Sequence, residues 1–176
     1  MHIAGYDQLS TLMTGRVSDL YRAWDAGADR WVALKVFRFS LADDEAEDIF
    51  FEDCEQAARL SAHPNVADLY DVGVTGNRHP YLVMELAEGA TVAHRLTSRS
   101  AGSFSAGQAV EIGLAVADAL QMAHDEGVVH RLLSPASIML TRDDEPLLTE
   151  LGVGMFTERW EAAGHLEEVV PYHAAP

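Results

Sequence analysis

Lys35 is the only lysine in a chain of 176 residues that carries 11 arginines. Lysine is a compact ammonium on a flexible stem and arginine is a planar fork of donors, so the two are not interchangeable. The chain therefore keeps an amine at one place while it uses arginine for positive charge elsewhere. Lys35 lies near the end of the apolar run Trp31–Phe37, which is typical of a strand. This makes Lys35 the first candidate for a residue that takes part in chemistry.

Three segments of the chain together resemble one known family. Residues Val32–Lys35 are similar to the strand motif V-A-I-K of protein kinases. Residues His130–Leu140 resemble the kinase catalytic loop H-R-D-L-K-P-x-N and the apolar strand after it. Residues Thr149–Gly152 occupy the place of D-F-G. Each motif alone is weak, but their order and spacing together favour a kinase-like chain.

Smaller similarities extend this resemblance over nearly the whole chain. His63–Val66 fits the turn after the kinase C-helix, and Val83–Gly89 fits the gatekeeper and hinge. The segment 171–176 resembles the stretch that ends in A-P-E, stopping before its Glu. The chain is thus identified as a member of the eukaryotic-type (Hanks-type) Ser/Thr protein kinase family, which implies an α+β, two-lobe fold. We expect residues 1–89 to form a complete N-lobe with the hinge, and residues 90–176 to form part of a helical C-lobe truncated near A-P-E.

The differences from the family pattern concentrate on the groups that act on phosphate. Leu132 stands where the family has the Asp that receives the proton of the substrate hydroxyl. Ser134 replaces the loop lysine, and Ser137 replaces the metal-binding Asn with a shorter and weaker ligand. Glu150 replaces the D-F-G Asp and retains the negative charge on a longer side chain. No catalytic group of the family's loop is therefore intact.

The glycine-rich loop that covers the nucleotide phosphates in kinases is also altered. Its three glycine positions correspond to Met13, Gly15 and Ser18, so only the central glycine is present. Side chains at the other two positions stiffen the loop or crowd the backbone's approach to phosphate.

The resemblance also implies a set of residues for binding a nucleotide. ATP would contact residues of the loop, the strand, the C-helix and the hinge, namely Gly15, Ala33, Lys35, Asp53, Met84, Glu85 and Ala87. In the family the C-helix acid pairs with the strand lysine. Here that acid is expected to be Asp53, with Glu52 or Glu55 as alternatives if the register shifts. Mg²⁺ would bind to Glu150, with Ser137 as the weaker ligand.

The pattern of apolar and turn residues predicts the elements that position these groups. Strands are expected at 19–24, 31–37, 66–74 and 81–86, with short strand-like pieces at 128–129, 138–140 and 146–148. A first helix is expected from a cap at Ser40 to about Leu60, and a second from a capping box at Ser105 to about Glu126.

The formal net charge is −16, which argues against nucleic acid and against an anionic membrane surface as partners. It is explained by solubility or, alternatively, by a basic protein partner. No apolar run approaches the roughly 18 residues of a membrane span. The lone cysteine, Cys54, can form no internal disulfide, which favours a reducing, cytoplasmic setting.

Three functions remain open. The first is a pseudokinase that acts as a nucleotide-binding or protein-interaction module in signalling. The second is an active or weakly active Ser/Thr kinase that transfers the ATP γ-phosphate to protein hydroxyls. The third is a nonfunctional kinase fragment.

Overall fold

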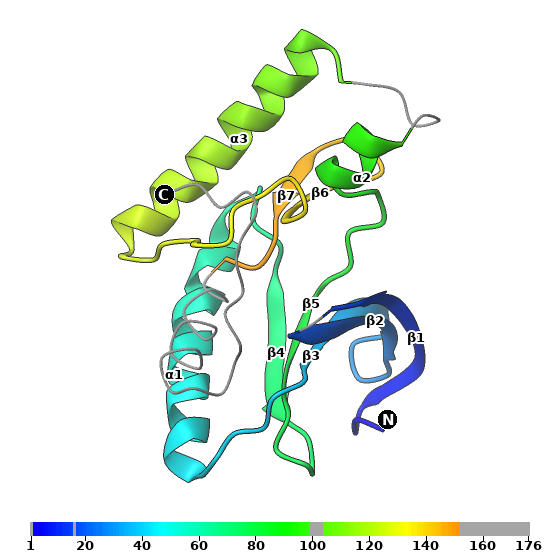
Figure 1. The fold of residues 1–176 in the computed structure, drawn as a ribbon, viewed down its shortest axis with the longest axis vertical. Helices are drawn as coiled ribbons and strands as arrows, with labels where there is room; N and C mark the ends of the chain where they lie inside the picture. Colours follow the sequence, from blue (N-terminus) through cyan, green and yellow to red (C-terminus); the bar gives the residue numbers. More distant parts are fainter. Residues whose placement is uncertain (1, 16, 99–103, 152–176) are drawn as a thin grey trace.

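A computed structural model describes residues 2–15, 17–98 and 104–151 (Figure 1). The segment 171–176 that resembles A-P-E lies outside these residues. One antiparallel sheet has the strand order β1-β2-β3-β5-β4, and a second sheet pairs β6 with β7. The strands are β1 Tyr6–Thr14, β2 Ser18–Asp25, β3 Arg30–Phe37, β4 Leu69–Val74, β5 Pro80–Glu85, β6 Ile138–Leu140 and β7 Pro146–Leu148. The helices are α1 Asp44–Arg59, α2 Val92–Thr97 and α3 Ala106–Asp125, and a 3-10 turn, Leu60–Ala62, follows α1.

The larger sheet and α1 form one end of the molecule, and α2, α3 and the small sheet form the other (Figure 1). This arrangement confirms the expected α+β fold, with an antiparallel N-lobe sheet and the start of a helical lobe. The division into residues 1–89 and 90–176 stays a prediction. In the described ranges no helix is both long and apolar enough to cross a bilayer.

The central strand β3 separates two apolar clusters because its side chains alternate between the faces of the sheet. One face packs beneath β1 and carries Val32, Leu34 and Val36. The opposite face carries Ala33, Lys35 and Phe37, and there Phe37 packs with Leu82 of β5 and with Phe50 and Cys54 of α1. Lys35 therefore faces the side of the sheet that α1 covers.

Helix α1 begins at a different residue from the one that the sequence suggested. The cap is Asp43, whose Oδ1 accepts a hydrogen bond from the amide of Ala46 at 2.9 Å, so the prediction of Ser40 was wrong. Aspartate is as good an N-cap as serine, and its negative charge also suits the helix dipole. The body of the helix agrees with the prediction.

Helix α3 confirms the predicted capping box. The amide of Gln108 donates to Ser105 Oγ at 3.2 Å, and the amide of Ser105 donates to Gln108 Oε1 at 3.0 Å. Gly127, with φ of 76°, follows the helix in the left-handed region that a helix end commonly requires.

The loop after α1 is bonded directly to β7. The amide of Leu148 donates to Asn65 O at 2.7 Å, and the amide of Ala67 donates to Leu148 O at 3.0 Å. Asn65 Nδ2 also donates to Pro146 O at 2.9 Å. We call this set of bonds the rear joint, because it ties the sheet end of the molecule to the helical end.

The connection from β5 to α2 lies against β6. The amide of Leu140 donates to Ala90 O at 3.0 Å, and Thr91 forms a bridge with Met139. A Cβ on Gly89 would lie 2.9 Å from Leu140 C and from Thr141 O, and closer still to Leu140 O. The backbone approach at this hinge therefore requires glycine.

Two predictions of strands were wrong, and two elements were not predicted. Strand β4 begins at Leu69 and not at Val66, which instead forms an isolated parallel bridge with Leu148. Residues 128 and 129 are not a strand, although Val128 is fully buried. Strand β1 and helix α2 were missed, because β1 is mostly exposed and polar and α2 has only six residues.

Candidate functional site

Lys35 lies on the central strand of the sheet with its side chain almost fully buried. It stands opposite Leu82 of β5, and Ala33 stands opposite Met84 two residues earlier on the same face. Only 11% of the Lys35 side chain is exposed. A buried charge is strongly unfavourable unless it is paired. The structure supplies the partner through an ion pair between Lys35 Nζ and Glu150 Oε1.

Glu150 reaches Lys35 from the segment that follows β7. Its φ is 65°, a left-handed conformation that is strained for a residue with a side chain, by about 1–3 kcal/mol. The preceding residue is fixed, because the amide of Thr149 donates to Ser137 O at 2.8 Å. Attraction by Lys35 lowers the pKa of Glu150, and this outweighs burial, which acts to raise it. Glu150 is therefore ionised at neutral pH.

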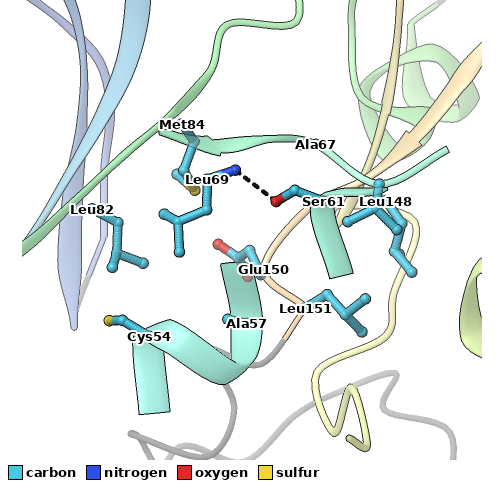
Figure 2. A pocket seen from close by; sticks show the side chains of 11 residues that line it. Cys54, Ala57, Ser61, Ala67, Leu69, Leu82, Met84, Leu148, Glu150 and Leu151 are labelled. Carbon is cyan, nitrogen blue, oxygen red and sulfur yellow. Dashed lines mark hydrogen bonds between the residues drawn. The ribbon is translucent and has the colours of Figure 1, made fainter. Parts of the chain in front are cut away.

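The Glu150 carboxylate points into a small cavity beneath the sheet (Figure 2). Figure 2 shows that Leu69, Leu82 and Met84 line one side and that α1, through Cys54 and Ala57, lines another. The cavity measures about 20 Å³, which is room for about one water molecule. Apolar walls and little water make the interaction between the two charges stronger than it would be at the surface.

His130 fixes the loop that lies below this ion pair. It is 2% exposed, and its Nε2 lies 3.0 Å from Thr149 O. The amide of Leu132 donates to His130 Nδ1 at 3.3 Å, so Nδ1 accepts and Nε2 must carry the proton. Burial lowers the pKa of His130, which agrees with a neutral ring. These contacts of His130 fit a structural role within the loop.

We expect the free energy of unfolding to fall as the pH is lowered and His130 becomes protonated. The folded-state pKa lies below the ordinary value of 6.5, so the unfolded chain binds a proton that the folded chain does not. The contribution of neutral His130 to the free energy of unfolding is fully present above about pH 6.5. It is lost as the pH falls toward the folded-state pKa, by at most about 1.4 kcal/mol per pH unit. Urea unfolding between about pH 7.5 and 5.5 measures it.

The variant His130→Gln keeps a donor near the ε-nitrogen but cannot titrate, so its stability should depend less on pH. His124→Gln is the matched control, because His124 is exposed on α3. If both variants flatten the pH dependence equally, the assignment to His130 is wrong.

Ser134 and Ser137 are bonded to each other within the loop. Ser137 Oγ donates to Ser134 O at 2.9 Å and accepts from the amide of Ser134 at 3.0 Å. Ser137 is 3% exposed, so its hydroxyl is used inside the loop and does not face the ion pair as an open ligand. Leu132, which is predicted to stand at the catalytic position, has no group that could accept a proton.

The hairpin between β1 and β2 turns tightly at Gly15. The Gly15 amide donates to Ser18 O at 3.0 Å, and a Cβ on Gly15 would lie 2.7 Å from the same oxygen. The turn itself therefore needs this glycine, whether or not a phosphate binds. Met13, which is predicted to stand at the first glycine position, is 57% exposed beside the turn.

The hinge and helix residues have less specific surroundings. The Glu85 amide donates to Asp68 O at 2.8 Å, whereas Ala87 has no backbone hydrogen bond to any other residue that the structure describes. Asp53 is buried on α1. The pairing of Lys35 with Asp53 stays a prediction. Sequence reasoning missed Glu150 as the ion-pair partner of Lys35. The sequence feature that could have predicted this pairing is the extra methylene of Glu relative to Asp, which extends the reach of the carboxylate.

The fold combines an antiparallel five-stranded sheet and one helix with a helical part, and a loop of that part lies beneath a buried lysine. This arrangement defines the class of two-lobe kinase folds. The sequence profile described as protein kinase domain matches residues 6–175. The chain belongs to the protein kinase family.

Relatives with names and solved structures support this assignment. The serine/threonine-protein kinase PknK of Mycobacterium tuberculosis is 31% identical over 98% of this chain, which spans 15% of that protein. A probable serine/threonine-protein kinase of Clostridium acetobutylicum is 33% identical over 79% of this chain and 21% of its own length. The crystal structure of the M. tuberculosis PknI kinase domain matches with a TM-score of 0.72 and 31% identity, covering 85% of this chain and 59% of that one.

Proposed function

We propose that this chain is a kinase-like domain without useful phosphotransfer, a pseudokinase that binds a nucleotide and acts on other proteins through its surface. The observation that carries the proposal is Leu132. Phosphotransfer relies on a carboxylate at this position to orient the substrate hydroxyl. Leu132 provides none, although its amide is bonded to His130 and the frame of the loop is intact.

Several groups around Lys35 support nucleotide binding beneath the sheet. Lys35 supplies an ammonium, and Ala33 on the same face of β3 has a small side chain. The backbone of Ala87, free of hydrogen bonds within the described residues, has a donor and an acceptor for a base edge. These residues fit ATP, in which the phosphates would provide the anion for Lys35.

A thermal-shift titration with ATP tests this part of the proposal. At about ten times the dissociation constant the ligand stabilises the fold by about 1.4 kcal/mol, or roughly 3–6 °C in a domain of this size. We expect a shift in the wild-type chain and a smaller one in Lys35→Ala. Arg59→Ala removes an exposed cation at the end of α1 and should behave as wild type. If the melting temperature of the wild-type chain does not change at millimolar ATP, nucleotide binding is contradicted.

An active Ser/Thr protein kinase is the alternative from a different class. It is supported by the names of the relatives and by the presence of both Lys35 and Glu150 in the cleft. Substrates would then be protein hydroxyls, with ATP as the phosphate donor. Radiolabelled phosphotransfer to a basic protein distinguishes it from the leading proposal.

The interaction role is supported by the net charge of −16, which favours a basic protein segment as partner. Such binding should weaken as salt is raised through about 0.15 M, where charges are screened beyond about 8 Å. If the affinity for a basic test peptide does not change with salt concentration, a basic partner segment is contradicted.

A nonfunctional fragment is the third candidate. Val110 and Leu114, exposed by 60% and 67% on α3, form an apolar face of the kind that a poorly folding chain would leave open. Cooperative urea unfolding of the purified chain would exclude this reading, and a gradual loss of structure would support it.

A further inference from the structure

Lys35 already has a counter-charge beneath the sheet. Lys35 and Glu150 form an ion pair of no net charge, and both lie between the sheet and the loop. The side chain of Glu150 is 28% exposed and that of Lys35 is 11% exposed, so little water screens either group. An anion that approaches Lys35 therefore meets a carboxylate that is already in its place.

The groups that would have to hold a divalent cation are either absent or engaged elsewhere. Mg²⁺ requires hard oxygen ligands in a nearly octahedral arrangement, usually one or two carboxylates together with phosphate oxygens and water. The Ser137 hydroxyl would have to give up two buried hydrogen bonds to Ser134 to reach a metal. Leu132 has no oxygen in its side chain. Within the described residues no three His, Cys, Asp or Glu side chains are grouped so as to hold a metal ion.

Glu150 is then the remaining carboxylate among the expected ligands, and its charge is neutralised by the ion pair with Lys35. Its backbone is fixed in a left-handed conformation next to Thr149, which is bonded to Ser137. Binding a cation through Glu150 would separate it from Lys35, and the other expected ligand, Ser137, is bonded inside the loop. The side chains present therefore do not fit the Mg²⁺ that kinases use.

We infer that the cleft binds nucleotides without a divalent cation, and that Glu150 acts as an internal anion that competes with the nucleotide phosphates for Lys35. This rests on the proposed nucleotide binding. The base and ribose would supply most of the affinity, because each phosphate must displace or tolerate the Glu150 carboxylate. Adenosine and ATP should then bind the wild-type chain with similar affinity.

Calorimetric titration with ATP and with adenosine, each in EDTA and in Mg²⁺, tests this inference. Replacing the carboxylate by an amide in Glu150→Gln leaves Lys35 without its competing anion. ATP should bind this variant at least about tenfold more tightly in EDTA, a difference of about 1.4 kcal/mol, and adenosine should bind both proteins equally. Mg²⁺ should leave the affinity of the wild-type chain for ATP unchanged within about twofold.

Asp143→Asn is the matched control, because it removes one negative charge from an exposed turn between β6 and β7. If it tightens ATP binding as much as Glu150→Gln, the effect comes from net charge and the inference is wrong. If Mg²⁺ tightens ATP binding to the wild-type chain about tenfold, the inference fails while nucleotide binding stands. If neither adenosine nor ATP binds any of these proteins, the proposed nucleotide site fails as well.

Discussion

Phosphotransfer from ATP to a protein hydroxyl by this chain is expected to be at least about 10⁴-fold slower than by an active kinase. Loss of a positioned base reduces the rate by about 10²–10⁴, and loss of a fixed charge stabiliser by about 10²–10³. The two effects are not additive, but active kinases turn over only about 1–100 times per second. Leu132, Ser134 and Ser137 together therefore leave less than about 10⁻² turnovers per second. Incorporation of radiolabelled phosphate into a basic protein measures the rate.

A stepwise restoration of the loop separates the contributions. Leu132→Asp alone should raise the rate by less than about tenfold, because Ser134 still offers no charge and Ser137 remains bonded inside the loop. The combined variant with Ser134→Lys and Ser137→Asn should gain more than the single one. Wild-type activity close to that of an active kinase, abolished by Lys35→Ala, would establish the enzyme and refute the proposed pseudokinase.

Gly89→Ala is expected to destabilise the fold by about 3 kcal/mol, the upper part of the range for overpacking. The new methyl group would overlap with Leu140 O and approach Leu140 C and Thr141 O to 2.9 Å. These are backbone atoms of β6 and its turn, so they cannot yield as the end of a flexible side chain would. Urea unfolding of the purified variant measures the loss.

Gly113→Ala provides a matched substitution within α3. A Cβ at Gly113 meets nothing within 4 Å, and alanine is the better helix former by about 1 kcal/mol. We therefore expect stabilisation by about 0.5–1 kcal/mol. If the two alanine substitutions change the free energy of unfolding equally, the close backbone approach at Gly89 does not explain the effect of Gly89→Ala.

Local patterns predicted several of the elements around the candidate site. Lys35 could be placed on a strand because it lies near the end of the apolar run Trp31–Phe37. The capping box at Ser105 gave the start of α3 because both of its hydrogen bonds are local. Leu132 could be recognised as a missing carboxylate because the residues around it keep the order of the catalytic loop.

Interactions between distant parts of the chain were beyond such patterns. Lys35 and Glu150 are 115 positions apart, and their pairing depends on how β7 docks against the loop after α1. The requirement for glycine at position 89 comes from Leu140 and Thr141, which only the folded chain brings close. The choice of Asp43 over Ser40 as a helix cap was an ambiguity between two good caps within one short segment.

The rear joint has a mechanical consequence for the cleft. Three hydrogen bonds connect residues 65 and 67 to residues 146 and 148, and a fourth contact joins His63 Nε2 to Asp118 of α3 at 3.1 Å. These bonds fix the distance between the two ends of the molecule at the back, on the side away from the β1–β2 hairpin. Any movement of the larger sheet relative to the helical end would therefore have to pivot near these bonds and near the second connection, where the amide of Leu140 donates to Ala90 O. The front edge of the sheet would swing widely, while Glu150, two residues beyond Leu148, would hardly move relative to the pivot.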